Sequence, residues 1–258
     1  TLGDTKNRLS DDLVRFRERL DRIEREVELE ESLTEQLDAQ RRSLICGRCW
    51  SQARPIPDPF CPCCGKPFAS PLALEESPGH HCGACREKPP AFAVARAAAL
   101  YEPGGTMRQA ILLFKYGGRL SMGCHLGRLM AREAGGLFEP GQYDLLIPVP
   151  LHPSRERERG FNQATLLAKE VGRAWGLRVG ARLLRRVRAT QAQSGRRPER
   201  EANVKGAFEV AQPDRVEGRR LLLIDDVFTT GATVNECAKA LLAAGAAEVA
   251  VYTLARVE

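Results

Sequence analysis

A continuous apolar run that passes directly into two carboxylates constrains the fold of this chain more than any other feature. Residues 221–224 are all apolar, and Asp225 and Asp226 follow them immediately. An unbroken apolar run is typical of a strand that is covered on both faces, as in a parallel sheet. Residues 234–244 are predicted to form a helix. The order of strand, acid pair, short loop and helix therefore indicates an α/β fold.

The loop between this strand and this helix has the features of a phosphate site. Residues 229–233 read TTGAT, and their small side chains leave the backbone N–H groups open to a ligand. Such amides at the start of a helix are well suited to bind phosphate. Asp225 and Asp226 would repel a phosphate, so we expect them to bind hydroxyls or a metal ion, as a ribose phosphate would require. The alternative is an ordinary strand–turn–helix with an acidic N-cap, but the coincidence of these elements favours a ligand site.

Most of the cysteines occur in pairs separated by two residues. Six of the nine belong to such pairs, which are Cys46 and Cys49, Cys61 and Cys64, and Cys82 and Cys85. Two CxxC pairs provide the four thiolates of a closed structural zinc site. Because no export signal is visible, we expect a cytoplasmic protein whose pairs bind metal rather than form disulfides. Residues 44–90, which are rich in Pro, Gly and Cys, are predicted to need this metal to fold.

The sequence gives an order of preference among the zinc ligands. The preferred set is formed by the second and third pairs: Cys61, Cys64, Cys82 and Cys85. The first pair comes next, and whether one or two ions bind stays open. His80 and His81 could replace a cysteine, although adjacent histidines before a CxxC pair are more often solvated. Cys124 and Cys237 lie in helix-like stretches and are expected to be packing residues.

The two ends of the chain have different patterns. Residues 9–42 contain no Gly or Pro, and their apolar residues repeat at spacings of three and four, which predicts an amphipathic helix with a short heptad pattern. We expect residues 1–43 to bind a partner helix or to self-associate, although the helix could instead pack on its own domain. Residues 91–258 alternate strand-like and helix-like segments, as in an α/β domain. No apolar run approaches the ~20 residues of a membrane span.

Further motifs add to the strand, acid pair and loop. These are IPVPLHPSRERERGFNQATLLA at residues 147–168 and RATQAQSGRRPEREANVKGAF at residues 188–208. With the paired cysteines, they make residues 44–256 resemble the ComF family, bacterial proteins linked to DNA uptake in natural competence. The resemblance implies a parallel sheet of the type I phosphoribosyltransferase kind, flanked by helices, at residues 91–258. A zinc-knuckle module at residues 44–90 and the N-terminal amphipathic helix at residues 1–43 would precede it.

The resemblance also implies a ligand and the residues that hold it. The expected ligand is phosphoribosyl pyrophosphate (PRPP), or a related phosphoribosyl compound, accompanied by Mg²⁺. Asp225 and Asp226 would hold the ribose hydroxyls as the catalytic pair. The 5′-phosphate would lie on the residues that follow them: Val227, Thr229, Thr230, Gly231, Ala232 and Thr233. The pyrophosphate would lie near a second group of residues: Leu151, His152, Arg155 and Arg159. Lys115 either reaches the same site or caps its own helix, and residues 188–208 would form a mobile hood.

Two classes of function fit these features. In the first, the protein transfers a phosphoribosyl group to an unidentified acceptor and releases pyrophosphate. In the second, it keeps the phosphate site without turnover and binds single-stranded DNA, or acts as an adaptor for a competence helicase through its N-terminal helix. The net charge is +6, and residues 171–200 are rich in Arg with a single Glu, which suits a nucleic-acid backbone. Aromatic residues make up only 6% of the chain, which argues against an extensive base-stacking groove.

Overall fold

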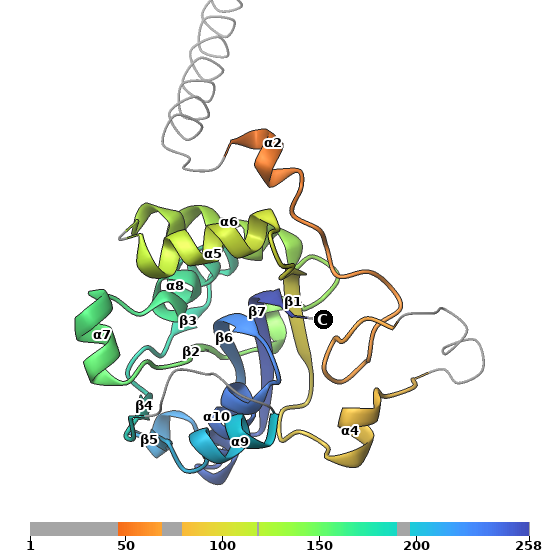
Figure 1. Cartoon of the computed structure of the whole chain (residues 1–258). Coiled ribbons are helices and arrows are strands. Elements are labelled where there is room, and N and C mark those ends of the chain that lie inside the picture. Colours follow the sequence, from red (N-terminus) through yellow and green to blue (C-terminus); the bar gives the residue numbers. More distant parts are fainter. Residues whose placement is uncertain (1–45, 69–78, 118, 190–196, 258) are drawn as a thin grey trace, which may run out of the picture. The chain divides into compact units, whose positions relative to one another are not determined.

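A five-stranded parallel sheet forms the centre of the protein (Figure 1). The computed structural model describes residues 46–68, 79–117, 119–189 and 197–257. In spatial order the strands of the sheet are β1 (Ala95–Leu100), β7 (Glu248–Arg256), β6 (Arg220–Phe228), β2 (Leu145–Pro148) and β3 (Arg178–Val179). A separate antiparallel ribbon is formed by β4 (Leu184–Arg186) and β5 (Phe208–Val210). The expectation of a parallel sheet is confirmed.

The apolar run of β6 lies in the middle of this sheet. Leu223 of β6 pairs with Ile147 of β2 on one side and with Val251 of β7 on the other. Residues 221–224 are all fully buried. A strand in this position is covered on both faces, which explains why its residues are apolar without alternation.

Helices cover both faces of the sheet (Figure 1). One face is covered by α5 (Thr106–Tyr116), α6 (Ser121–Glu133) and α8 (Gln163–Trp175). The other is covered by α10 (Ala232–Ala243), with α9 (Arg197–Val204) packed beside it. Successive residues of β7 point to opposite faces. Val251 joins the core on the α10 side, whereas the Tyr252 hydroxyl donates a 2.6 Å hydrogen bond to the carbonyl of Met130 in α6.

The remaining short helices lie in connections, and they are α2 (Gly47–Trp50), α4 (Gly83–Glu87), η1 (Pro140–Gln142), α7 (Pro153–Arg159) and η2 (Pro213–Arg215). The chain divides into two units, residues Thr1–Gly47 and Arg48–Glu258. Within the second unit, Cys61, Cys64 and Cys82 share one core with Ala95 and Val251. The cysteine module therefore packs directly on the β1–β7 edge of the sheet. The helix expected at residues 9–42 lies outside the described residues, and its partner role stays a prediction.

The structure adds detail at three places. The strand β6 includes the acid pair and continues through Asp225 and Asp226 to Phe228. The Glu/Arg-rich stretch after β2 is the helix α7, because His152 caps its start and Gly160 ends it with a φ of +80°. Part of the expected hood is regular, since Arg197–Val204 form α9. Residues 190–196 of that segment lie outside the described part.

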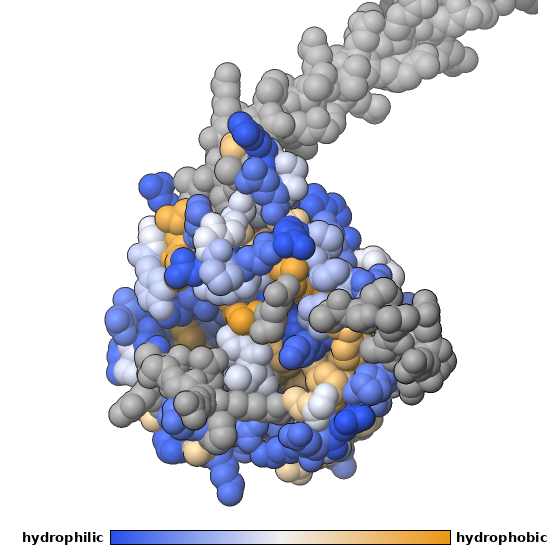
Figure 2. Space-filling view, turned by 45° about the vertical axis from the view of Figure 1, so that its right-hand side comes forward, coloured by the Kyte–Doolittle hydropathy of each residue, from blue (hydrophilic) through white to orange (hydrophobic). Residues whose placement is uncertain are grey.

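The face of the molecule in Figure 2 is mostly hydrophilic, with small apolar areas between the polar side chains. Among the described residues, no helix combines the length and the apolar content that crossing a membrane would require.

Candidate functional site

A cavity of about 380 Å³ lies at the carboxyl ends of β2 and β6. Ligands of open α/β sheets commonly bind at this edge, because the loops that follow the strands meet there. Its lining comes from five segments of the chain, and the residues are Tyr101, Lys115, Tyr116, Val149, Pro150, Leu151, Arg155, Arg159, Asn162, Gln163, Ala164, Arg186, Asp225, Asp226, Val227, Phe228, Thr229, Gly231, Ala232, Thr233 and Val234. Four basic and two acidic side chains are among them. This balance suits a ligand with several negative charges.

The acid pair occupies the end of β6 that faces this cavity. Lys115 Nζ donates a 2.8 Å hydrogen bond to Asp226 Oδ1, so Lys115 reaches the site rather than capping its helix. Burial raises the pKa of Asp225 to about 7, and the adjacent Asp226 carboxylate adds to this effect. Burial opposes the charged form of Lys115, but the attraction of Asp226 outweighs it and raises the pKa of Lys115. A ligand that brings hydroxyls or a cation to Asp225 would relieve this concentration of negative charge.

The loop after the acid pair leads directly into the N-terminus of α10. Gly231 is the N-cap of α10 and has a φ of +79°, a backbone conformation that residues other than glycine rarely adopt. A Cβ atom at Gly231 would lie 2.6 Å from the ring of Phe228. Glycine is therefore required here by both the backbone and the neighbouring ring. The first N–H groups of a helix have no partner within the helix, so this end of α10 offers donors and a positive dipole to an anion.

The basic side chains come from two other segments. Arg155 and Arg159 lie on α7, and Arg186 lies on β4. Arg159 donates a 2.9 Å hydrogen bond to Gln163 Oε1, and its guanidinium carbon lies 5.2 Å from the centre of the Tyr116 ring. Gln163 is 1% exposed, and its Nε2 atom has no hydrogen-bond partner among the described residues. A buried amide N–H of this kind is suited to donate a hydrogen bond to a ligand oxygen.

The cavity brings together all of the predicted ligand residues except two. The Oγ1 atom of Thr230 accepts a 3.4 Å hydrogen bond from the Ala232 N–H, and Thr230 borders a second cavity of about 210 Å³ beside the cysteine cluster. His152 Nδ1 accepts from the Ser154 N–H at 3.3 Å and so caps α7. Both residues make local hydrogen bonds, and neither lines the cavity.

Sequence reasoning missed several residues that line the cavity. Asn162 and Gln163 lie within the motif at residues 147–168, so they could have been included among the expected ligand residues. Arg186 was counted with the basic surface of residues 171–200, but the structure turns it inwards to the cavity. Tyr101 follows β1 and Tyr116 ends α5, and no local pattern in the sequence brings either of them to this site.

Four cysteines converge in a separate cluster. The Sγ atoms of Cys61, Cys64, Cys82 and Cys85 all lie within 4.8 Å of one another, and those of Cys64 and Cys82 are 3.7 Å apart. A tetrahedral zinc ion with Zn–S bonds of about 2.3 Å places its sulfurs about 3.8 Å apart. The spacing therefore fits one structural zinc ion held by the preferred ligand set.

The backbone of the first knuckle supports this arrangement. Gly65 has a φ of +69°, its N–H donates to the Cys61 carbonyl at 2.8 Å, and a Cβ there would lie 2.8 Å from the Ala95 carbonyl oxygen. The Cys82 N–H points to Cys61 Sγ at 3.4 Å. Burial alone would raise the pKa of the Cys61 thiol, but backbone hydrogen bonds lower it to about 7. Backbone donors thus favour the thiolate, which is the form that binds zinc.

The remaining cysteines differ from one another. Cys46 is exposed, and the side chain of Cys49 lies outside the described part of the chain. Cys237 is buried in α10, as expected for a packing residue. The same expectation is wrong for Cys124, which is exposed on α6 with its Sγ atom 3.7 Å from a Glu170 carboxylate oxygen.

Two family models match the chain. Residues 35–89 match the double zinc ribbon domain, and residues 159–258 match the phosphoribosyl transferase domain. The first match covers the cysteine cluster and supports structural zinc in this module. The second covers α8, the acid pair and the loop before α10.

Several curated proteins are similar to the chain over most of its length. The DNA utilization protein YhgH of Escherichia coli O6:H1 is 37% identical, over 82% of this chain and 90% of that protein. Competence protein F of Haemophilus influenzae is 31% identical over the same shares of the two chains. Competence protein ComFC of Bacillus subtilis is 27% identical, over 82% of this chain and 84% of that protein.

Proposed function

The chain belongs to the ComF family, and from this premise we propose that its central cavity binds PRPP together with Mg²⁺. One observation carries the proposal: the same cavity contains a helix N-terminus preceded by small residues and an acid pair on the adjoining strand. An inorganic phosphate would need only the helix N-terminus. The acid pair gains a role when the ligand also carries hydroxyls or a cation.

The lining divides naturally among the parts of this ligand. The 5′-phosphate would lie on the first turn of α10 and on Thr229, and the ribose hydroxyls would face Asp225 and Asp226. The pyrophosphate would then lie towards α7, where Arg155 and Arg159 provide guanidinium donors that match phosphate oxygens. In this placement each charged group of PRPP meets a side chain or a helix end of opposite charge.

Magnesium would enter this site with the pyrophosphate. Mg²⁺ prefers oxygen ligands and is commonly bound by one or two carboxylates together with substrate phosphates. Asp225 and Asp226 provide the carboxylates, on the same side of the cavity as the ribose. When bound, the ion would neutralise charge on the pyrophosphate and so make it a better leaving group.

The same placement suits transfer of the phosphoribosyl group. As the bond between ribose C1 and the pyrophosphate oxygen breaks, positive charge develops on the ribose, and the two carboxylates would stabilise it. Arg155 and Arg159 would hold the departing pyrophosphate. An acceptor nucleophile would form the new bond to C1 from the open side of the cavity. We propose that this chemistry, or the binding of PRPP that precedes it, serves DNA uptake, which the names of the competence relatives suggest.

A ligand series tests the binding proposal. Titration calorimetry should give the highest affinity for PRPP with Mg²⁺, a lower affinity for ribose 5-phosphate, a still lower one for inorganic phosphate, and no detectable binding of ribose. Equal affinities for PRPP and inorganic phosphate would contradict the proposal. Release of pyrophosphate on addition of candidate amines or bases would then distinguish an enzyme from a protein that only binds PRPP.

A second candidate function is the binding of single-stranded DNA. Five arginines between residues 171 and 188 have exposed side chains, and they are Arg173, Arg178, Arg182, Arg185 and Arg188. Arg173 is paired with Glu170, and Arg188 donates to the carbonyls of Asn203 and Lys205. The other three are the better candidates for phosphate contacts, which would make the affinity strongly dependent on salt.

The salt dependence of binding tests this candidate. Replacing Arg178, Arg182 and Arg185 with Gln should lower the slope of log affinity against log salt by about 2, because each lost contact to a single strand contributes about 0.7. A variant with the exposed Arg128, Arg132 and Arg215 replaced by Gln has the same net charge and is the control. Identical slopes in the two variants would reject a specific DNA surface at residues 171–188.

A further inference from the structure

A buried arginine connects the cysteine cluster to the loop of residues 229–233, here called the phosphate loop. Arg256 is the last residue of β7 and is 6% exposed. Its Nη1 atom donates a 2.6 Å hydrogen bond to the Cys64 carbonyl, and its Nη2 atom lies 3.7 Å from Cys64 Sγ. Its guanidinium carbon lies 4.5 Å from the centre of the Phe228 ring. One side chain therefore contacts both a zinc-ligand residue and the last residue of β6.

The Phe228 ring in turn contacts the phosphate loop. The position of a Cβ at Gly231 is 2.6 Å from this ring, so the loop rests directly on it. On another side the ring meets Phe92 edge-on, with the ring centres 6.1 Å apart. The Val257 N–H donates to the Phe228 carbonyl at 2.9 Å and fixes the backbone. In a close-packed interior, a ring held on several sides transmits the position of one neighbour to another.

Charge makes this series of contacts dependent on the metal. One Zn²⁺ with four thiolates has a net charge of −2, since two positive and four negative charges combine. The Arg256 guanidinium beside Cys64 neutralises part of that charge and donates towards sulfur. Loss of the ion would release Cys64 from the cluster, so this buried guanidinium would lose the fixed carbonyl and sulfur that it contacts, which is unfavourable in a low-dielectric interior. The Arg256 side chain would then change position, and the Phe228 ring that it contacts would shift as well.

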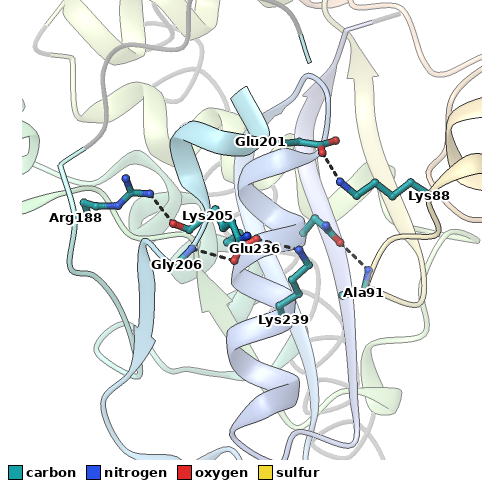
Figure 3. A network of polar contacts seen from close by, with 9 residues as sticks. Lys88, Ala91, Arg188, Glu201, Lys205, Gly206, Glu236 and Lys239 are labelled. Atoms are coloured by element: carbon teal, nitrogen blue, oxygen red, sulfur yellow. Dashed lines mark hydrogen bonds and ion pairs between the residues drawn. The ribbon is translucent and has the colours of Figure 1, made fainter. Parts of the chain in front are cut away.

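Lys88 at the end of the cysteine module and Ala91 just after it also contact the helices α9 and α10 (Figure 3). The Ala91 N–H donates a 2.7 Å hydrogen bond to Oδ1 of Asn235, which lies in the first turns of α10. Lys88 Nζ lies 2.5 Å from Glu201 Oε2 of α9. The Lys88 pair is largely exposed and adds little stability, whereas the Asn235 bond is partly buried. The segment that connects the module to β1 thus contacts the start of α10 at a second point.

We propose that Arg256 is a positioning residue through which the occupied zinc cluster holds the phosphate loop in its binding conformation. Zinc at the cysteines and an anionic ligand at residues 229–233 then strengthen each other's binding. The inference rests on the proposed function for the identity of that ligand. Linkage makes the effect reciprocal, so zinc must raise the affinity for the ligand by the same factor by which the ligand raises the affinity for zinc. We expect a factor of about ten, within the usual range for coupled sites.

The test uses full-length protein in which Co²⁺ replaces zinc, because the absorption of cobalt–thiolate bonds reports the geometry of the cluster. In the wild type, PRPP with Mg²⁺ should change this absorption and slow the release of cobalt to a chelator by about tenfold. In Arg256→Met, PRPP should bind more weakly by a similar factor and leave the absorption unchanged. Arg256→Lys keeps the charge and should restore part of both effects. Unchanged absorption in wild type saturated with PRPP would overturn the inference.

Two matched variants separate coupling from simple damage. Arg220 lies at the opposite end of the same strand pair and is paired with Glu248, so Arg220→Met should behave as the wild type. Arg96 also packs on the cysteine module, where it donates to the Pro62 carbonyl and lies over Phe60. Arg96→Met should release metal faster but, once loaded, bind PRPP as the wild type does. A loss of PRPP affinity in loaded Arg96→Met equal to that in Arg256→Met would contradict a specific role for Arg256.

Hydrogen exchange keeps the inference testable in two unfavourable cases. If Arg256→Met fails to fold by circular dichroism, Phe228→Leu should retain the metal and lose the absorption response. If the wild type does not bind PRPP, the proposed function fails, but exchange of residues 228–234 still reports the coupling. Removal of the metal should accelerate amide exchange of these residues in the wild type. With the metal bound, Arg256→Met and Arg256→Lys should each exchange faster there than the metal-bound wild type does. Exchange that is insensitive to the metal would overturn the inference whatever the ligand.

Discussion

Lys115 Nζ of α5 lies 2.8 Å from Asp226 Oδ1 at the end of β6, and the two side chains are only 21% and 14% exposed. This pair compensates one of two adjacent carboxylates in a cavity that otherwise concentrates negative charge at the end of a strand. The second carboxylate, Asp225, has a pKa raised to about 7 by burial and by its neighbour. The apo protein therefore carries an electrostatic cost at the position where we place the ribose.

Loss of the Lys115 ammonium should expose this cost. Lys115→Met should lower the free energy of unfolding by about 3 kcal/mol, near the lower end for breaking a buried ion pair, because both carboxylates would lose their nearest cation. Urea unfolding measures the change. Lys239→Met is the control, since it removes an i,i+3 pair with Glu236 whose lysine is 51% exposed, and it should change stability by less than about 0.5 kcal/mol. Equal losses of unfolding free energy in the two variants would show that the Lys115 pair stabilises the protein no more than an exposed pair does.

The raised pKa of Asp225 predicts how stability changes with pH. The folded protein retains the Asp225 proton up to about pH 7, whereas an unfolded chain releases it near pH 4. Because the folded state binds more protons between these values, the contribution of Asp225 to stability falls as pH rises from about 4 to 7. Asp225→Asn should therefore gain stability relative to the wild type as pH is raised from 5 to 8, by about 1.4 kcal/mol for each pH unit up to about 7.

Thermal unfolding across this pH range, without ligand, measures the effect. Asp214→Asn, at an exposed position in η2, should show no such trend relative to the wild type. A stability difference between Asp225→Asn and the wild type that is constant from pH 5 to 8 would refute the raised pKa.

Gly231 should tolerate no side chain, for two separable reasons. Gly231 and Gly136 have the same φ of +79°, but a Cβ at Gly136 would meet nothing within 4 Å. Gly136→Ala should therefore cost only the backbone term of about 1 kcal/mol. Gly231→Ala should cost a further 1–3 kcal/mol, roughly the cost of overpacking, because its methyl group meets the Phe228 ring. Comparison of the two unfolding curves isolates this contact, and equal costs would show that the ring yields freely.

The cysteine cluster predicts the metal content. Purified protein should hold zinc in the second and third cysteine pairs, and Cys64→Ser should lose that ion and, with it, the order of the module. Cys63 is adjacent in sequence but is not part of the four-sulfur cluster, so Cys63→Ser should retain the metal and the fold. Metal analysis of both variants decides between these outcomes. Zinc retained by Cys64→Ser but lost by Cys63→Ser would replace the assigned ligand.

The sequence was most informative where one segment carries both structure and chemistry. Residues 221–233 indicated the sheet and the ligand loop together, because strand burial, carboxylates and a helix start are all local properties. The strand ends two residues beyond the acid pair because Phe228, paired opposite Arg256, continues the ladder. The four cysteines of the preferred set lie in one cluster, and within each pair the CxxC spacing brings two thiolates to one turn.

Other parts of the site depend on contacts that no local pattern reveals. Tyr101 and Tyr116 reach the cavity only because their elements pack on the same edge of the sheet. In the sequence, Arg186 cannot be distinguished from the other arginines of the basic surface, but in the structure it lies on β4 and lines the cavity. Arg256 at the end of β7 carried no signal at all, since its importance comes from meeting Cys64, which is 192 residues away along the chain.

The central claim is that the acid pair recognises the part of the ligand that a plain phosphate lacks. Titration of the double variant Asp225→Asn with Asp226→Asn against PRPP with Mg²⁺ and against inorganic phosphate tests it most directly. The variant should bind inorganic phosphate at least as tightly as the wild type does, because the helix N-terminus is intact and the repulsion is reduced. It should lose the preference for PRPP, with an affinity reduced by about tenfold or more for the lost polar contacts to a charged group. An unchanged preference for PRPP in the double variant would contradict the assignment of Asp225 and Asp226 to the ribose and the metal.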